Sequence, residues 1–104
     1  MVRILIVEDQ KIMQKYFEYI IMQEPGLRHV QTVSDAREAV KICGYSAIDL
    51  VLMDVQTFHN HDGLSAGKII REKYPYTKVK VVTSLIDPKV LERAKRGCAA
   101  SLWY

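Results

Sequence analysis

The sequence predicts an α/β protein built on a doubly wound parallel β-sheet, with helices on both of its faces. Short apolar runs alternate along the chain with segments whose apolar residues recur at helical spacing. Strict alternation of this kind requires parallel strands joined by crossover helices. The runs are continuously apolar, as expected for strands that are buried on both sides. The 104 residues suffice for one domain with a real core but not for two.

The first two strands and the helix between them are marked by a change of period. Residues 2–7 form a short apolar run and are predicted to be a buried strand. Residues 10–24 repeat apolar side chains at helical spacing, and Pro25 and Gly26 end that helix. Residues 27–33 are predicted to be the second strand. The apolar face expected for the helix consists of Ile12, Met13, Tyr16, Phe17, Ile20 and Ile21.

The second helix and the third strand follow directly. Residues 34–44 begin with Asp35 three positions before Glu38, a capping-box spacing, and Gly44 is expected to end the helix. Residues 48–53 are the most apolar segment and are predicted to be the third strand. The remaining elements are expected to be a loop, a helix, a strand, a helix and a strand, at residues 57–63, 64–75, 78–84, 88–97 and 99–104.

The end of the chain falls inside this pattern. A doubly wound sheet needs a further helix to cover its fifth strand, and the sequence stops at Tyr104 before one can form. We therefore expect residues 1–104 to be a single domain that is truncated after its fifth strand.

Composition excludes several classes of function. The formal net charge is only +3, with Lys and Arg scattered along the chain, so no nucleic-acid-binding surface is predicted. No apolar run approaches the length of a membrane span, and the first residues lack the features of a signal peptide. Cys43 and Cys98 belong to no CxxC motif. Free thiols in a reducing cytoplasm are expected, with a structural disulfide as the alternative.

Acidic and hydroxyl side chains stand where the predicted strands end. The first strand is followed by Glu8 and Asp9, the third by Asp54, and the fourth ends with Thr83 and Ser84. Ligands of open α/β sheets bind just beyond the carboxyl ends of the strands. If the first, third and fourth strands are adjacent, these groups converge on one crevice.

Three carboxylates in one crevice repel each other unless a cation lies among them. These side chains provide only oxygen ligands, and such hard donors suit Mg²⁺ or Mn²⁺. A carboxylate beside such an ion can attack phosphorus to form an aspartyl-phosphate, while the metal neutralises charge on the phosphoryl oxygens. The pattern therefore predicts a metal-dependent phosphoryl-transfer site.

Each of these residues also has an ordinary structural explanation. The acid pair could cap the following helix, Asp54 could occupy a turn, and the hydroxyls could form a strand-end turn. Their conjunction at one end of the sheet favours a site. Asp49, at the opposite end of its strand, is expected to be a surface or turn residue. His59 and His61 could add metal ligands or a proton source, although solvent-facing histidines are the more common case.

Five stretches carry a resemblance that runs the full length of the chain. They are ILIVED at 4–9, DLVLMD at 49–54, DG at 62–63, VVTS at 81–84 and RGCAASLWY at 96–104. In these stretches the chain resembles the response regulator receiver domain, the CheY-like module of two-component signalling. Its SLWY ending is similar to the NarL/LuxR-type subset. The resemblance implies a flavodoxin-like, five-stranded parallel sheet with strand order 2-1-3-4-5, whose last helix is absent from this chain.

The resemblance also implies roles for individual residues. Asp54 is similar to the family's phosphoacceptor, and Glu8 and Asp9 are similar to its acidic metal pocket. The backbone carbonyl of Gln56 would be the remaining protein ligand of the ion, Mg²⁺ or Mn²⁺. Thr83 resembles the switch hydroxyl that hydrogen-bonds the phosphoryl group.

The function implied by the resemblance is a phosphorylation switch in the cytoplasm. A sensor histidine kinase would phosphorylate Asp54, and the domain would catalyse its own phosphorylation and dephosphorylation without being a turnover enzyme in the usual sense. The output would be a homodimer formed through residues 88–104, or a downstream DNA-binding domain that lies outside this chain. No contact with membranes is expected.

Departures from the family pattern keep a second function open. The lysine that normally follows the fifth strand is missing, and Leu102 stands at the position of the switch aromatic. The loop VQTFHNHDG at 55–63 lacks the usual Met-Pro and is one residue longer. The alternative is a pseudo-receiver, an interaction module of the same fold that is not phosphorylated. A flavodoxin-like cofactor binder is a distant third, because the acidic segment after the first strand would repel a phosphate.

Overall fold

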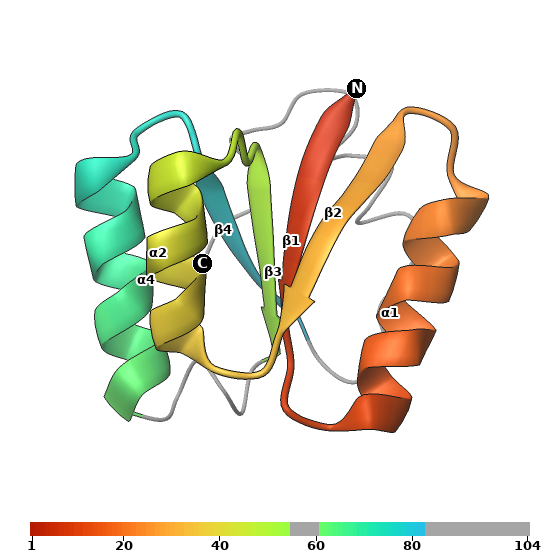
Figure 1. Ribbon diagram of the computed structural model, residues 1–104, viewed down its shortest axis with the longest axis horizontal. Helices are drawn as coiled ribbons and strands as arrows, with labels where there is room; N and C mark the ends of the chain where they lie inside the picture. Colours follow the sequence, from red (N-terminus) through yellow and green to blue (C-terminus); the bar gives the residue numbers. More distant parts are fainter. Residues whose placement is uncertain (55–60, 83–104) are drawn as a thin grey trace.

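Within the part of the chain that the structure describes, four parallel strands form one sheet in the order β2-β1-β3-β4 (Figure 1). The structure, a computed structural model, describes residues 1–54 and 61–82. The strands are β1 (Val2–Val7), β2 (Leu27–Val33), β3 (Leu50–Asp54) and β4 (Lys78–Val82). The helices are α1 (Lys11–Gln23), α2 (Ala36–Tyr45) and α4 (His61–Lys73).

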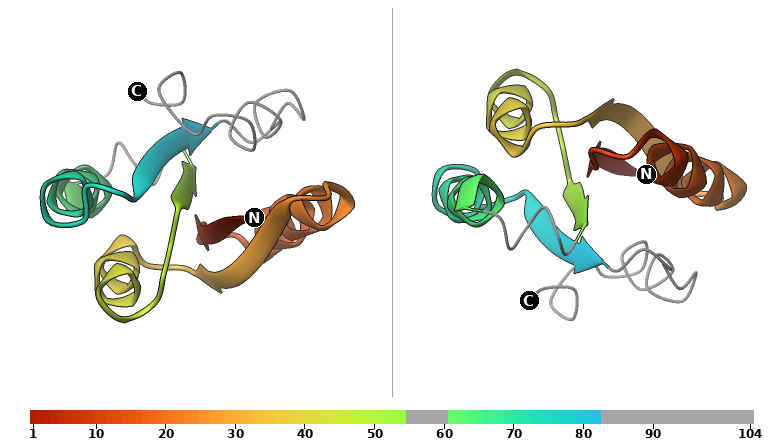
Figure 2. Two further views of the ribbon diagram at one scale, coloured as in Figure 1. Left: turned by 90° about the horizontal axis from the view of Figure 1, so that it is seen from above. Right: turned by 90° about the horizontal axis from the view of Figure 1, so that it is seen from below.

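The helices cover both faces of the sheet. α1 lies on one face, and α2 and α4 lie together on the other, as the views from the front and from either end show (Figure 1, Figure 2). The predicted α/β class and the predicted order of the first four strands are confirmed. The fifth strand and the helix before it, expected at 99–104 and 88–97, lie outside the described residues.

Alternation along the strands divides the core into two clusters, as parallel strands buried on both faces require. On the α1 face, Ile4 and Leu52 belong to one cluster with Phe17, and none of the three is exposed at all. On the other face, Leu5 and Ile70 are equally buried. Each fully buried side chain of this size stabilises the fold by about 1.5–3 kcal/mol.

α1 begins and ends close to the predicted positions. The chain leaves the helix through Gly26, whose φ of 96° lies in the left-handed region that favours glycine. The expected apolar face is confirmed for Phe17 and Ile21, which are buried, but is wrong for Ile12, which is 79% exposed. Phe17 stands five positions after Ile12 in the helix, which turns the two side chains about 140° apart.

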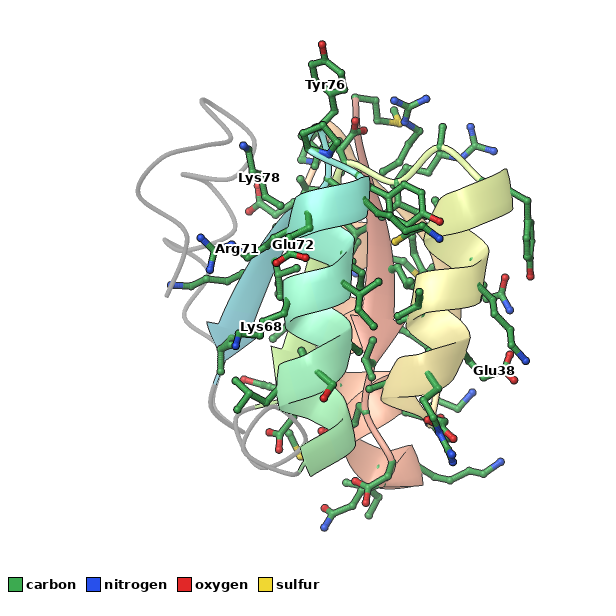
Figure 3. All side chains as sticks on the ribbon, turned by 90° about the vertical axis from the view of Figure 1, so that its left-hand side faces the viewer. Glu38, Lys68, Arg71, Glu72, Tyr76 and Lys78 are labelled. Atoms are coloured by element: carbon green, nitrogen blue, oxygen red, sulfur yellow. The ribbon has the colours of Figure 1, made fainter. Side chains whose placement is uncertain are left out.

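α2 has the predicted start but a different end. The Asp35 carboxylate accepts a hydrogen bond from the backbone N–H of Arg37 at 2.8 Å and caps the helix. The expectation that Gly44 ends the helix is wrong, because α2 continues to Tyr45. Packing against α4, which lies beside α2 over the sheet (Figure 3), accounts for the glycine. A Cβ at Gly44 would lie 2.9 Å from the Tyr74 hydroxyl oxygen.

α4 begins earlier than predicted. Residues 61–63, expected to lie in a loop, form its first turn, and the helix ends two residues before Pro75. The Asp–Gly pair at 62–63 suggested a turn, but an acidic residue in a first helical turn is also favoured by the helix dipole. The strand before α4 is shifted as well. β3 runs from Leu50 to Asp54 rather than over 48–53, so Asp54 belongs to the strand itself.

Asp49 joins β1 and β3 at the amino end of the sheet. Its carboxylate accepts hydrogen bonds from the Arg3 backbone N–H at 2.8 Å and from the Arg3 guanidinium at 2.8 and 3.0 Å. Its own backbone N–H donates to the Arg3 carbonyl at 2.9 Å. The Asp49 side chain is 29% exposed. It is therefore a surface residue, as expected, but one with a specific partner far away in the sequence.

Cys43 is a buried free thiol, as expected. Burial raises the pKa of this thiol to about 11, so the thiolate needed for disulfide exchange or metal binding is disfavoured near neutral pH. Cys98 lies outside the described residues, so the prediction for it stays a prediction.

Candidate functional site

Adjacent strands bring two of the predicted site residues together. β1 pairs with β3, and Val7 lies opposite Met53 in the sheet. Glu8 and Asp54 each come one residue after this pair, so both reach the carboxyl end of the sheet at the same level. On the next strand, Val82 lies opposite Asp54. The predicted adjacency of the first, third and fourth strands is thus confirmed.

The two carboxylates at this end of the sheet are buried. Glu8 is 2% exposed and Asp54 is 7% exposed, whereas Asp9 is exposed. Elsewhere in the described residues the core holds one more polar side chain, Thr77, whose hydroxyl donates to a backbone carbonyl at 2.6 Å. A buried charge is costly unless it is paired or binds a metal. Two neighbouring buried carboxylates therefore mark this end of the sheet as a candidate site.

Hydrogen bonds fix Glu8 but leave one of its oxygens unsatisfied. Oε2 accepts from the backbone N–H of Gln10 at 2.8 Å. The backbone N–H of Glu8 donates to the Val33 carbonyl at 3.0 Å, and its backbone carbonyl accepts from the Gln14 side chain at 2.6 Å. Oε1 is buried and has no hydrogen-bond partner among the described residues. A buried oxygen in this state commonly marks the place of an ion or a water molecule.

The pKa of Glu8 is raised above its ordinary value. Burial is the main cause, and the neighbouring carboxyl groups of Asp9 and Asp54, whose negative charge disfavours the ionised form of Glu8, add to it. The N–H of Gln10, which stabilises the ionised carboxylate, opposes these effects. The contribution from Asp54 agrees with the strand register, which brings the two carboxylates to the same end of the sheet.

The donors present suit a hard divalent cation. Glu8 and Asp54 offer buried carboxylate oxygens, with Asp9 at the exposed edge, and Mg²⁺ prefers oxygen ligands of this kind. Over residues 1–54 and 61–82, no three His, Cys, Asp or Glu side chains are grouped closely enough to hold a metal by themselves. Gln56 and Thr83 lie outside the described residues, so their roles stay predictions.

Sequence reasoning missed two residues that support the acid pair. Gln10 supplies the N–H that binds the Glu8 carboxylate, and Gln14 supplies the amide that binds the Glu8 carbonyl. Glutamines at the start of a helix beside an acid pair were the available signal, because the first N–H groups of a helix need acceptors. Of the two histidines considered as extra ligands, His59 lies outside the described residues and His61 is the first residue of α4.

A family model for the response regulator receiver domain matches residues 4–101 of the chain. The chain belongs to this family. No helix within the described part of this receiver domain is long and apolar enough to cross a membrane.

Known proteins similar to this receiver domain include regulators with different outputs. A protein-glutamate methylesterase/protein-glutamine glutaminase of Carboxydothermus hydrogenoformans is 33% identical over 86% of this chain and 25% of its own length. The response regulator domain of Thermotoga maritima CheB is 31% identical, with a TM-score of 0.69 over 83% of this chain and 63% of that one. A LuxR-family regulator from Aurantimonas is 26% identical, with a TM-score of 0.69 over 89% and 64%.

The receiver domain spans about a quarter of the length of the first curated relatives that it matches. Its likeness to a LuxR-family regulator agrees with the resemblance seen in the SLWY ending. The domain is also similar to the response regulator domain of CheB. The comparisons therefore confirm the family and include the expected subset among its relatives.

Proposed function

We propose that this receiver domain is a switch controlled by Mg²⁺-dependent phosphorylation of Asp54 by a sensor histidine kinase. Glu8, Asp9, Asp54 and the backbone carbonyl of Gln56 hold the ion, Mg²⁺ or Mn²⁺, and Thr83 is the switch hydroxyl. One observation carries the proposal. Glu8 and Asp54 are buried side by side at the carboxyl ends of β1 and β3, and Oε1 of Glu8 has no hydrogen-bond partner among the described residues.

Asp54 is the nucleophile of this reaction. One of its carboxylate oxygens forms a bond to the phosphorus of a phosphohistidine, the P–N bond breaks, and the imidazole nitrogen keeps the electron pair and takes up a proton. Mg²⁺, when bound, neutralises the charge of the carboxylates and of the phosphoryl oxygens. Because Asp54 is only 7% exposed, little water reaches the acyl phosphate that forms on it. The domain thus catalyses a change in itself rather than repeated turnover of a substrate.

The product carries the signal as charge. The phosphoryl group on Asp54 carries about −1.5 to −2 charges, and part of this replaces the charge that the carboxylate loses when the acyl phosphate forms. The Thr83 hydroxyl then hydrogen-bonds the phosphoryl group, and the helix expected at 88–97 follows, so that a local charge biases a two-state element. The output is a homodimer formed through residues 88–104, or a DNA-binding domain downstream of them. Likeness to a LuxR-family regulator supports the second output.

Family membership supports the partner and the setting. Receiver domains interact with histidine kinases or with histidine phosphotransfer proteins. A partner of this kind in the cytoplasm would present the phosphohistidine to the carboxyl end of the sheet, where Asp54 lies.

Incubation with Mg²⁺ and acetyl phosphate, followed by intact mass spectrometry, tests the proposal. The wild-type protein should gain one phosphoryl group, and EDTA should abolish the gain. Asp54→Asn should gain none. Asp49→Asn is the matched control, since it makes the same chemical change at the other end of the same strand region and should be phosphorylated like the wild type. A gain of mass that survives in Asp54→Asn would contradict the assignment.

The pseudo-receiver is the alternative function. The loop at 55–63 favours it, because the family's usual Met-Pro after the phosphoacceptor is replaced by VQTFHNHDG. An absence of mass gain in the wild type with Mg²⁺ and with Mn²⁺ would support this alternative. Binding to a protein partner should then be the same for the wild type and for Asp54→Asn.

A further inference from the structure

We infer that Gln14 is a positioning residue that sets the metal affinity of the Glu8–Asp54 site, an inference that rests on the proposed function. Its half-buried side-chain amide, at the end of the first turn of α1, makes two hydrogen bonds. It donates to the backbone carbonyl of Glu8 at 2.6 Å and to the hydroxyl oxygen of Ser34 at 3.3 Å. An amide group has two protons, so both bonds can exist at once.

The two bonds join separate loops at the carboxyl end of the sheet. Glu8 begins the loop from β1 to α1, and Ser34 lies between β2 and α2, directly before the capping residue Asp35. The backbone N–H of Gln14 also donates to the Gln10 carbonyl at 2.9 Å. Gln14 therefore braces both loops against the start of α1.

The bond to the Glu8 carbonyl acts on both members of the acid pair. That carbonyl belongs to the peptide group that links Glu8 to Asp9, so its orientation sets the direction of both side chains. Glu8 is already held by the Val33 carbonyl at its N–H and by the Gln10 N–H at Oε2. With Gln14 on its carbonyl, Glu8 is held at three points, so the position of its remaining oxygen, Oε1, is restricted as well. Groups that orient metal ligands without touching the metal commonly change its affinity by about 10–100-fold.

Four variants separate this role from a general effect on stability. Gln14→Ala removes both hydrogen bonds, and Gln14→Glu keeps the shape but cannot donate when ionised. Ser34→Ala removes only the longer bond. Gln23→Ala is the matched control, because Gln23 is an exposed glutamine at the other end of α1. Each protein is titrated with Mn²⁺ in the absence of any phosphodonor, and its phosphorylation by acetyl phosphate is followed over a range of Mg²⁺ concentrations.

The dissociation constant for Mn²⁺ should rise about tenfold in both Gln14 variants, less in Ser34→Ala, and not at all in Gln23→Ala. The Mg²⁺ concentration that gives half-maximal phosphorylation should rise by the same factor. The rate at saturating Mg²⁺ should stay within about twofold of the wild-type rate, because the metal, once bound, restores the geometry. A purely structural role would not produce this split.

Three results would overturn the inference. They are an unchanged Mn²⁺ constant in both Gln14 variants, a lower rate at saturating Mg²⁺ with an unchanged Mg²⁺ requirement, and failure of both variants to fold. If the wild-type protein binds Mn²⁺ but is not phosphorylated, the proposed function is overturned. The Mn²⁺ dissociation constants of the Gln14 variants then decide the role of Gln14 by themselves. Wild-type protein that binds neither ion would overturn both proposals.

Discussion

At the residue scale, Glu8 combines near-complete burial with an oxygen that no described group satisfies. A buried acceptor without a partner costs about 1–3 kcal/mol of stability. The charge of neighbouring Asp54 adds to that cost, since it too disfavours the ionised form of Glu8. Proteins keep such local conflicts where a function needs them. The conflict at Glu8 is relieved if a cation binds the two carboxylates.

Removal of the Glu8 charge should stabilise the metal-free protein. Burial raises the pKa of folded Glu8 above its unfolded value of about 4.3. The folded state therefore binds the proton more tightly, and wild-type stability falls as the pH rises above that value. In Glu8→Gln, which stays neutral, this loss is absent. Without metal, the variant should melt about 4–8 °C higher at pH 7, the equivalent of about 1 kcal/mol, and the gap should close near pH 4.

Thermal unfolding followed by circular dichroism between pH 4 and pH 8, in EDTA, checks this prediction. Glu38→Gln is the matched control, since it makes the same chemical change at an exposed glutamate near the start of α2. A Glu8→Gln variant that melts below the wild type at pH 7 would contradict the electrostatic account.

The Arg3–Asp49 pair should give the opposite dependence on pH. The hydrogen bond from the Arg3 side chain is the main cause that holds the pKa of Asp49 below its ordinary value. The stabilisation is therefore present above the unfolded pKa of about 3.9 and is lost as the pH falls through the folded value. Asp49→Asn should melt a few degrees below the wild type at pH 7, a small effect because the pair lies on the surface. The difference should vanish on acidification and shrink at high salt, as melting curves at each condition would show.

Single residues were predictable where the sequence itself carries the reason. Glu8 and Asp54 were predictable because each follows an apolar strand, and Asp35 because it stands at capping distance from a helix. The partner of Asp49 was not, since Arg3 lies 46 residues away in the chain. Gln14 was not predictable either, because its hydrogen bonds depend on where the fold places a backbone carbonyl.

At the element scale, the contact between α2 and α4 depends on a missing side chain. Gly44 lies inside α2, where alanine is ordinarily favoured over glycine by about 0.5–1 kcal/mol. A Cβ there would approach the Tyr74 hydroxyl oxygen to 2.9 Å, closer than such atoms pack. The Tyr74 side chain must therefore shift before alanine at position 44 can stabilise the helix by the usual amount.

A double-mutant cycle tests this contact. In the Tyr74→Phe background, Gly44→Ala should raise the free energy of unfolding by about 0.5–1 kcal/mol, because the obstructing hydroxyl is gone. In the wild-type background the same substitution should be neutral or destabilising. Urea denaturation of the four proteins gives the coupling energy. Equal effects of Gly44→Ala in the two backgrounds would show that the hydroxyl does not restrict the helix contact.

Element boundaries show the same division between local and tertiary causes. Pro25 and Gly26 end α1 for reasons of backbone conformation, and sequence reasoning found them. Gly44 carries an equally strong local signal for a helix end, but its place is set by Tyr74, which directly follows α4. The first turn of α4, at 61–63, was missed because its Asp–Gly pair favours both turns and helix starts.

At the scale of the whole molecule, topology assembles the site. Alternation of strands and helices made the parallel sheet predictable, and the adjacency of β1, β3 and β4 brings together residues that are 46 positions apart, Glu8 and Asp54. In the unfolded chain the two carboxylates are far apart, because no single stretch of the sequence holds both. A cation that needs both ligands can therefore bind only to the folded domain. At the proposed metal site, binding and folding should therefore be coupled, since an ion that needs both carboxylates binds the native arrangement far better than the unfolded one.

Mg²⁺ should consequently stabilise the entire domain rather than one loop. At a concentration ten times the dissociation constant, binding to the native state alone adds about 1.4 kcal/mol to the free energy of unfolding. For a domain of this size, that raises the melting temperature by about 6–11 °C. The rise should appear in one cooperative transition, seen alike by circular dichroism and by calorimetry, because the acidic side chains stand at the carboxyl ends of β1 and β3, which pair with each other in the sheet.

NaCl at matched ionic strength should not reproduce the effect of Mg²⁺, because screening acts on every surface charge and not on the buried pair. Glu8→Gln and Asp54→Asn should each lose most of the rise, whereas Asp49→Asn should keep it, since Asp49 lies at the other end of the sheet. An equal rise in Glu8→Gln would mean that the ion binds elsewhere. The unsatisfied oxygen of Glu8 would then have another partner than a cation shared with Asp54.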